Sequence, residues 1–124
     1  MAKTVLVVDD ENDIRVFLKT LLEDNGYSAI TAEDGEAGYS IAKKEKPSLI
    51  CLDISMPNVS GVKAYRNLCD DSETKDIPVV MITGISPEFE DFIKNRKQVK
   101  PPAAYFEKPI DKDEFIKTVN ELTS

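Results

Sequence analysis

Short apolar runs alternate along this chain with stretches that carry apolar residues at helical spacing. Three runs, Thr4 to Val8, Leu49 to Leu52 and Ile77 to Ile82, are typical of parallel strands buried on both faces, because a half-exposed strand would alternate polar with apolar residues. Two shorter segments, Tyr27 to Ala32 and Ala103 to Glu107, complete a set of five. The alternation predicts an α/β domain with helices on both faces of a parallel sheet.

A helical pattern follows each predicted strand. The first helix carries an apolar stripe, Ile14, Phe17, Leu18, Leu21 and Leu22, and stops at Asn25-Gly26. The other helices are predicted after Asp34-Gly35, after Gly61, from Pro87 to about Lys97, and from Asp111, where Glu114 completes a capping-box pattern. At 124 residues without a repeat or linker, residues 1–124 form one predicted domain.

Composition excludes several classes of function. The net charge of −7 disfavours non-specific attraction to nucleic acid or to an anionic membrane. The chain has no histidine, which rules out histidine catalysis and histidine metal sites, and its two cysteines, Cys51 and Cys69, lack metal-binding spacing. We find no signal peptide and no apolar run long enough to span a bilayer, so the expected location is the cytoplasm.

Polar residues stand where the predicted strands end. Parallel strands end along one edge of a sheet, so this edge should gather Asp9, Asp10, Asp53, Thr83 and Lys108. Three clustered carboxylates disfavour joint ionisation unless a cation compensates, and oxygen-only donors suit Mg²⁺. A carboxylate, a metal, a hydroxyl and a lysine are together the parts needed to handle a phosphoryl group.

Each of these residues also has an ordinary structural interpretation. Asp9 and Asp10, taken alone, are equally consistent with caps of the first helix. Thr83 alone would be a strand-end hydroxyl, and Lys108 alone a surface lysine. The functional interpretation rests on the set and not on one member.

Four segments resemble the receiver domain of two-component response regulators. They are VVDDEND at 7–13, LDISMPNVSG at 52–61, ITG at 82–84 and YFEKPI at 105–110, in the family's order and close to its spacing. The resemblance covers essentially the whole chain, and it is to a receiver domain that either stands alone, as in single-domain regulators of the chemotaxis type, or is cut from a longer regulator. It implies a flavodoxin-like, doubly wound (βα)5 three-layer sandwich whose five-stranded parallel sheet has the order 2-1-3-4-5.

The resemblance also implies a role for each acidic residue. Asp53 would be the phosphoacceptor. Asp10 would bind Mg²⁺ directly, Asp9 directly or through water, and the main-chain carbonyl of Ser55 would complete the protein ligands together with Asp53. The implied phosphodonor is a phosphohistidine of a sensor histidine kinase or phosphotransfer protein, or a small phosphodonor.

Three further residues would convert phosphorylation into a change of surface. By resemblance, Lys108 pairs with Asp53 and then with phosphoryl oxygens, while Thr83 donates its hydroxyl to the phosphoryl group and Tyr105 turns into the space that Thr83 vacates. The implied output is contact with a downstream protein through the face of the fourth helix, fifth strand and fifth helix. The segment from Thr83 to Lys108 is longer than in the family, and Pro101-Pro102 replaces its usual turn.

These expectations describe a phosphoacceptor switch and not an enzyme that acts on a separate substrate. The expected oligomeric state is a monomer or weak dimer. Two alternatives come from other classes. A haloacid-dehalogenase-type phosphatase also uses a strand-end aspartate and Mg²⁺, but resembles a D-x-D arrangement, whereas Asp9 and Asp10 are adjacent here. An interaction module of receiver shape that works without phosphate is the second alternative, and the complete acidic set argues against it.

Overall fold

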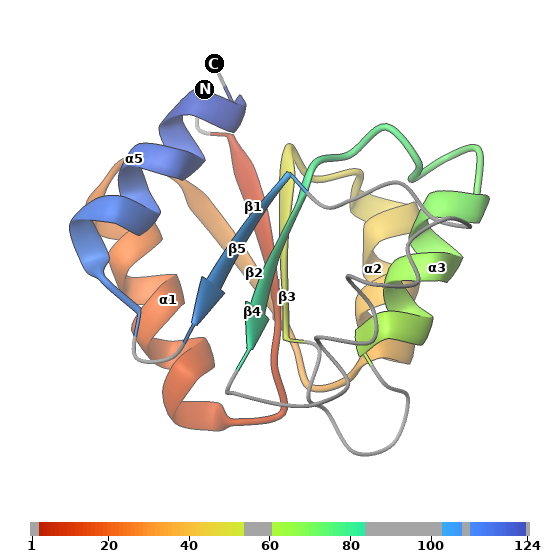
Figure 1. Ribbon diagram of the computed structural model, residues 1–124, viewed down its shortest axis with the longest axis horizontal. Coiled ribbons are helices and arrows are strands. Elements are labelled where there is room, and N and C mark those ends of the chain that lie inside the picture. Colours follow the sequence, from red (N-terminus) through yellow and green to blue (C-terminus); the bar gives the residue numbers. More distant parts are fainter. Residues whose placement is uncertain (1–2, 54–60, 84–102, 108–109, 124) are drawn as a thin grey trace.

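The computed structural model describes residues 3–53, 61–83, 103–107 and 110–123. From the first strand to the fourth strand, helices and strands alternate as the sequence predicts (Figure 1). In chain order they are β1 (Thr4–Val8), α1 (Asn12–Asp24), β2 (Ser28–Ala32), α2 (Gly35–Glu45), β3 (Leu49–Asp53), α3 (Gly61–Asp70), β4 (Val79–Thr83), β5 (Ala104–Glu107) and α5 (Lys112–Thr123). The helix predicted from Pro87 to about Lys97 lies outside the described residues.

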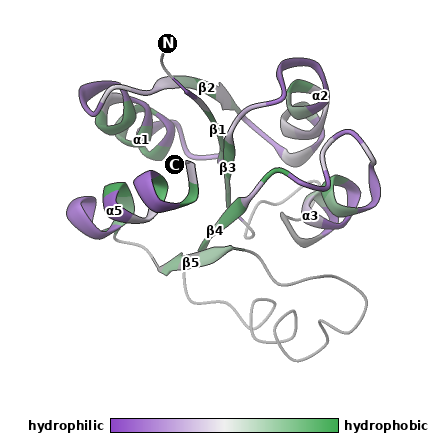
Figure 2. Ribbon diagram, turned by 90° about the horizontal axis from the view of Figure 1, so that it is seen from above, coloured by the Kyte–Doolittle hydropathy of each residue, from purple (hydrophilic) through white to green (hydrophobic). Residues whose placement is uncertain are grey.

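One parallel sheet organises the molecule. Its strand order is β2-β1-β3-β4-β5, which confirms the predicted order of the sheet, and every neighbouring pair is parallel. Helices α1 and α5 cover one face, and α2 and α3 cover the other (Figure 2). The strand order reverses direction between β1 and β3, and in open α/β sheets ligands bind beyond the carboxyl ends of the strands at such a point.

The two faces of the sheet take alternate residues of each strand. In β1, Leu6 and Val8 pack in the core under α2 and α3, whereas Val5 and Val7 pack in the core under α1 and α5. All four are buried, because both faces of the strand are covered. This is why the central strands read as unbroken apolar runs in the sequence.

Local capping fixes where the helices begin and end. Gly26 adopts φ +88°, the left-handed conformation predicted for the stop after α1. The side chain of Asp34 accepts the N–H of Ala37 at 2.8 Å, and that of Asp111 accepts the N–H of Glu114 at 3.0 Å. The predicted starts of α2 and α5 are therefore confirmed.

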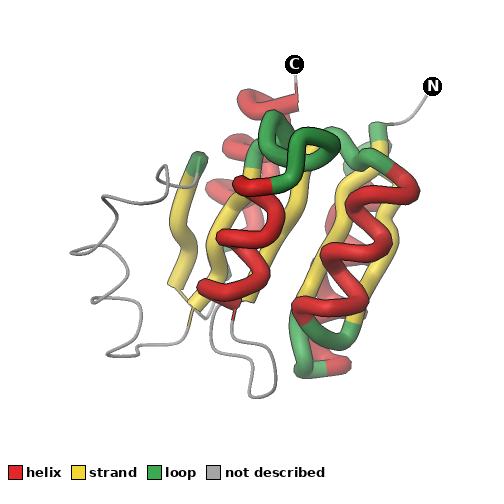
Figure 3. Tube along the Cα trace, turned by 90° about the vertical axis from the view of Figure 1, so that its right-hand side faces the viewer, coloured by secondary structure: helices red, strands yellow, loops and turns green. Residues whose placement is uncertain are grey.

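Two details differ from the sequence predictions. Strand β4 begins at Val79 instead of Ile77, because the N–H of Ile77 donates to Thr74 in the preceding turn and Pro78 has no N–H. Phe17 lies at the margin of the buried stripe of α1 and is 36% exposed, while Leu18 is fully buried. Figure 3 shows α2, α3 and the turn that leads into β4 from the side.

Candidate functional site

The sheet register brings the ends of β1 and β3 together. Val8 pairs with Leu52, so the next residues, Asp9 and Asp53, lie beside one another at the carboxyl edge of the sheet. Asp53 in turn pairs with Ile82 of β4, which places the backbone of Thr83 at the same edge. These neighbours follow from strand pairing and not from proximity in the sequence.

Three carboxylates meet at this edge. Asp9, Asp10 and Asp53 each offer an oxygen, and these oxygens lie within 4.8 Å of one another. Asp9 and Asp53 are buried, at 1% and 0% exposure, whereas Asp10 is exposed and opens the cluster to solvent. We call these three residues the acid cluster. Within the described part of the chain, no other group of acidic, cysteine or histidine side chains is close enough to share a metal.

The structure decides between capping and clustering for the first two aspartates. Helix α1 begins at Asn12 with Glu11 in the N-cap position, so neither Asp9 nor Asp10 is its N-cap. The Oδ1 atom of Asp9 accepts the N–H of Glu11 at 2.9 Å, which tightens the turn between β1 and α1. Asp9 thus shapes the turn while its carboxylate faces Asp10 and Asp53.

The donor chemistry of the acid cluster fits a hard divalent cation. Carboxylate oxygens are the ligands that Mg²⁺ and Ca²⁺ prefer, and a positive ion would offset the mutual repulsion of the three carboxylates. The nearest cysteine in sequence, Cys51, is fully buried in β3, and burial raises the pKa of its thiol to about 12. A protonated thiol is a poor metal ligand, so the cluster could hold a metal through oxygen alone.

The remaining predicted site residues are described in part or not at all. The backbone of Thr83 ends β4, and the backbone of Tyr105 in β5 pairs with Met81 of β4; the side chains of Thr83 and Tyr105 lie outside what the structure describes. Ser55 and Lys108 lie outside the described residues altogether. Their roles remain predictions from the family resemblance.

Arg15 is a residue beside the cluster that the sequence patterns did not single out. It lies in the first turn of α1 and is half-buried. Its Nη1 atom donates to the main-chain carbonyl of Asp9 at 2.7 Å, and its Nη2 atom donates to Oδ1 of Asn12 at 3.3 Å. In the sequence, Arg15 is recognisable only as an arginine about one helical turn beyond the strand-end aspartates. That position alone does not distinguish a site residue from a solvent-exposed one.

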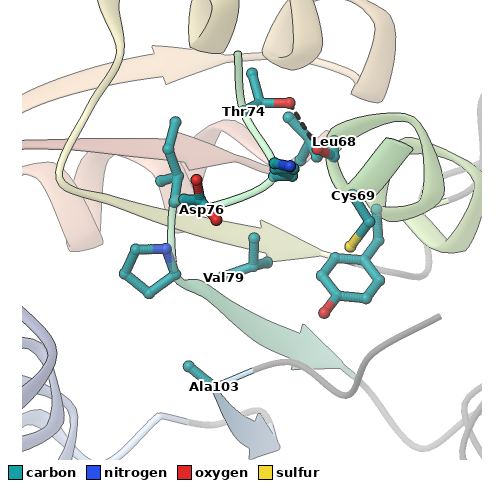
Figure 4. Close-up of a pocket in the computed structure, with 10 residues that line it drawn as sticks. Leu68, Cys69, Thr74, Asp76, Val79 and Ala103 are labelled. Carbon is teal, nitrogen blue, oxygen red and sulfur yellow. Dashed lines mark hydrogen bonds between the residues drawn. The ribbon is translucent and has the colours of Figure 1, made fainter. Parts of the chain in front are cut away.

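A pocket of about 230 Å³ lies at the other end of the strands (Figure 4). Residues from α3, from the turn before β4 and from the residue before β5 line it, among them Leu68, Cys69, Val79 and Ala103. The hydroxyl of Thr74 donates to the carbonyl of Leu68 across one wall at 2.6 Å. None of the three acid-cluster residues is among the described residues that line this pocket, so the pocket is separate from the acid cluster.

Comparisons with known proteins agree with the geometry. The family model for the response regulator receiver domain matches residues 5–120. Protein PilH of Pseudomonas aeruginosa is 34% identical over 118 residues, which cover 95% of each chain, and the polar-differentiation response regulator DivK of Brucella anthropi is 32% identical over 119 residues, which cover 96% of this chain and 94% of DivK. Chemotaxis response regulator CheY4 of Vibrio cholerae has a structure that matches with a TM-score of 0.84 at 27% identity, covering 98% of this chain and 99% of CheY4.

The chain belongs to the response regulator receiver domain family of two-component signalling. Its fold is the α/β fold of the chemotaxis regulators, with a parallel sheet between two layers of helices. The family assignment sets aside the haloacid-dehalogenase alternative that the strand-end aspartates had left open. In the described residues, no helix is long and apolar enough to cross a membrane.

Proposed function

We propose that Asp53 accepts a phosphoryl group from a phosphohistidine of a sensor histidine kinase or phosphotransfer protein, or from a small phosphodonor. The observation that carries this proposal is the fully buried carboxylate at the end of β3, within 4.8 Å of two others. An oxygen of Asp53 forms a bond to phosphorus, the bond from phosphorus to the donor atom breaks, and its electron pair leaves with the donor.

We assign the acid cluster as the protein part of a Mg²⁺ site, with the main-chain carbonyl of Ser55 as a further ligand. The ion, when bound, supplies positive charge that offsets the carboxylates and the phosphoryl oxygens. Asp9 and Asp53 contribute buried carboxylates, and the backbone of Asp53 is also paired with Ile82 of β4. Asp10 contributes an exposed carboxylate on the solvent side.

The switch itself is proposed from the family resemblance. Lys108 pairs with the phosphoryl oxygens, Thr83 donates its hydroxyl to them, and Tyr105 turns in response. The readout is contact with a downstream protein through the face that the resemblance assigns to the predicted fourth helix, β5 and α5. We therefore propose a cytoplasmic phosphoacceptor, monomeric or weakly dimeric, that has no separate substrate.

The test is intact mass after incubation with acetyl phosphate and Mg²⁺. We expect the native chain to gain one phosphoryl group, and Asp53→Ala or omission of Mg²⁺ to abolish the gain. Asp24→Asn is the matched control, because Asp24 is an exposed carboxylate at the far end of α1 and should leave the gain intact. A folded native chain that gains no mass and binds no beryllofluoride would refute the proposal and favour an interaction module that works without phosphate.

A further inference from the structure

Arg15 joins helix α1 to the end of strand β1. Its guanidinium group donates to the carbonyl of Asp9 at 2.7 Å and to Oδ1 of Asn12 at 3.3 Å. The two acceptors lie on either side of the turn that carries Asp10. A planar guanidinium with both ends occupied is held in one orientation, which a single-point ammonium would not be.

The contact with Asp9 fixes more than one residue. The carbonyl of Asp9 and the N–H of Asp10 belong to the same planar peptide unit, so fixing the carbonyl also fixes the start of Asp10. The N–H of Asp9 donates to Ala32 at 3.2 Å, and the carboxylate of Asp9 accepts the N–H of Glu11 at 2.9 Å. Arg15 therefore supplies a side-chain contact that sets the orientation of the Asp9–Asp10 peptide.

We infer that Arg15 is a positioning residue for the Mg²⁺ site: its guanidinium holds the turn that presents Asp9 and Asp10 to the cation. The inference rests on the proposed function, because it takes the acid cluster to be a cation site. Arg15 acts through the backbone of Asp9 and is not itself a metal ligand, since a guanidinium has no lone pair to donate.

The sign of the effect separates positioning from simple electrostatics. A positive guanidinium near the cluster repels a cation, so removing its charge should tighten Mg²⁺ binding if charge alone matters. Removing a residue that orients the metal ligands should instead weaken Mg²⁺ binding, because Asp9 and Asp10 lose their fixed arrangement. Weaker binding after loss of a positive charge has only the second explanation.

Isothermal titration with MgCl₂ tests this on the native chain, Arg15→Ala, Arg15→Lys and Lys19→Ala. Loss of a residue that orients metal ligands costs roughly ten- to a hundredfold in affinity, and we expect about tenfold weaker binding for Arg15→Ala. Arg15→Lys should recover part of the loss, because an ammonium keeps one donor to Asp9. Lys19 is an exposed cation one turn further along α1, so Lys19→Ala is the matched control for charge and should leave affinity unchanged or slightly tighter.

A thermal melt without Mg²⁺ shows whether each variant is folded. If Arg15→Ala does not fold, Asn12→Ala removes the second acceptor of the guanidinium and should weaken binding by a smaller factor. Unchanged or tighter binding in a folded Arg15→Ala, while the native chain binds Mg²⁺, would overturn this inference alone. A native chain that binds no Mg²⁺ would overturn the proposed metal site and this inference together.

Discussion

Two groups of carboxylates lie at opposite ends of the strands, and they handle charge differently. At the carboxyl edge, the acid cluster gathers three carboxylates within 4.8 Å. After α3, on the side of the amino ends, Asp71 meets groups of complementary character. Its Oδ2 atom accepts the hydroxyl of Tyr39 at 2.5 Å and lies 3.2 Å from Nζ of Lys43, while its Oδ1 atom accepts the N–H of Glu73 at 2.8 Å.

Groups of the chain itself stabilise the negative charge of Asp71. The hydrogen bond from Tyr39, the N–H of Glu73 and the charge of Lys43 together lower the pKa of Asp71 to about 2. In return, Asp71 raises the pKa of Tyr39 and the pKa of Lys43. The acid cluster instead brings three like charges together, and a bound cation would offset their mutual repulsion. We therefore expect a structural role for Asp71 and a ligand-binding role for the acid cluster, because different groups surround the two sets of carboxylates.

The largest expected effect is the response of stability to Mg²⁺. A ligand that binds only the native state stabilises it by about 2.7 kcal/mol when its concentration is a hundred times Kd. Urea unfolding with and without saturating MgCl₂ should show this gain in the native chain, and EDTA should remove it. Asp71→Asn should show the same gain, because Asp71 is not part of the acid cluster. A gain that depended on Asp71 would break the distinction between the two groups.

Asp10→Asn should produce two effects of opposite sign. We expect at least about tenfold weaker Mg²⁺ binding, or about 1.4 kcal/mol, because a charged ligand is lost. Without Mg²⁺, the same variant should be more stable by up to about 1 kcal/mol, because one of three repelling charges is removed. Titration calorimetry and thermal melts in EDTA measure the two effects separately. Lower stability of Asp10→Asn in EDTA would show that the cluster is not under repulsion.

Much of this comparison could be predicted from the sequence. The apolar runs of β1 and β3 each end in an aspartate, and parallel pairing is enough to bring Asp9 and Asp53 to one edge. The same reasoning could not decide whether Asp9 or Asp10 caps the first helix, because a cap and a site residue would both stand just after a strand. The choice depends on where α1 begins, and helix ends are set by local geometry within one or two residues.

Contacts between distant side chains could not be predicted in the same way. Tyr39 and Asp71 are 32 residues apart, and neither stands at the end of a strand. The contact between Tyr39 and Asp71 depends on how α2 packs beside α3. A pattern of apolar residues does not determine the position of one helix along the other. Arg15 likewise reaches a main-chain carbonyl, and side-chain rotamers decide such contacts, so a sequence pattern does not identify the acceptor.

Asp71→Asn should lower the free energy of unfolding at neutral pH, and this loss should become smaller as the pH falls. The pKa of Asp71 is lowered in the native state from 3.8 to about 2, so its contribution is full above about pH 4 and is lost as the pH falls toward 2. Thermal melts should therefore show a lower Tm for Asp71→Asn than for the native chain at pH 7, and a difference that shrinks below pH 4. Because Asp71 is near the surface, we expect a smaller change than those at the acid cluster. A difference that persists unchanged to pH 2 would mean that shape, and not ionisation, makes Asp71 matter.

The smallest effect is expected from Lys43→Gln. Lys43 lies 3.2 Å from Asp71 and 3.7 Å from Glu73, and its Nζ atom stands 5.7 Å from the ring centroid of Tyr39. Its side chain is 42% exposed, so water and salt screen both ion pairs, whereas the hydrogen bond between Tyr39 and Asp71 stays in place. At low salt, we expect Lys43→Gln to lower Tm by less than Asp71→Asn does. In 1 M NaCl, we expect this decrease to disappear. If Lys43→Gln instead matched Asp71→Asn at both salt concentrations, the lysine and not the tyrosine would be the main partner of Asp71, and the group would depend on charge pairing as strongly as the acid cluster does.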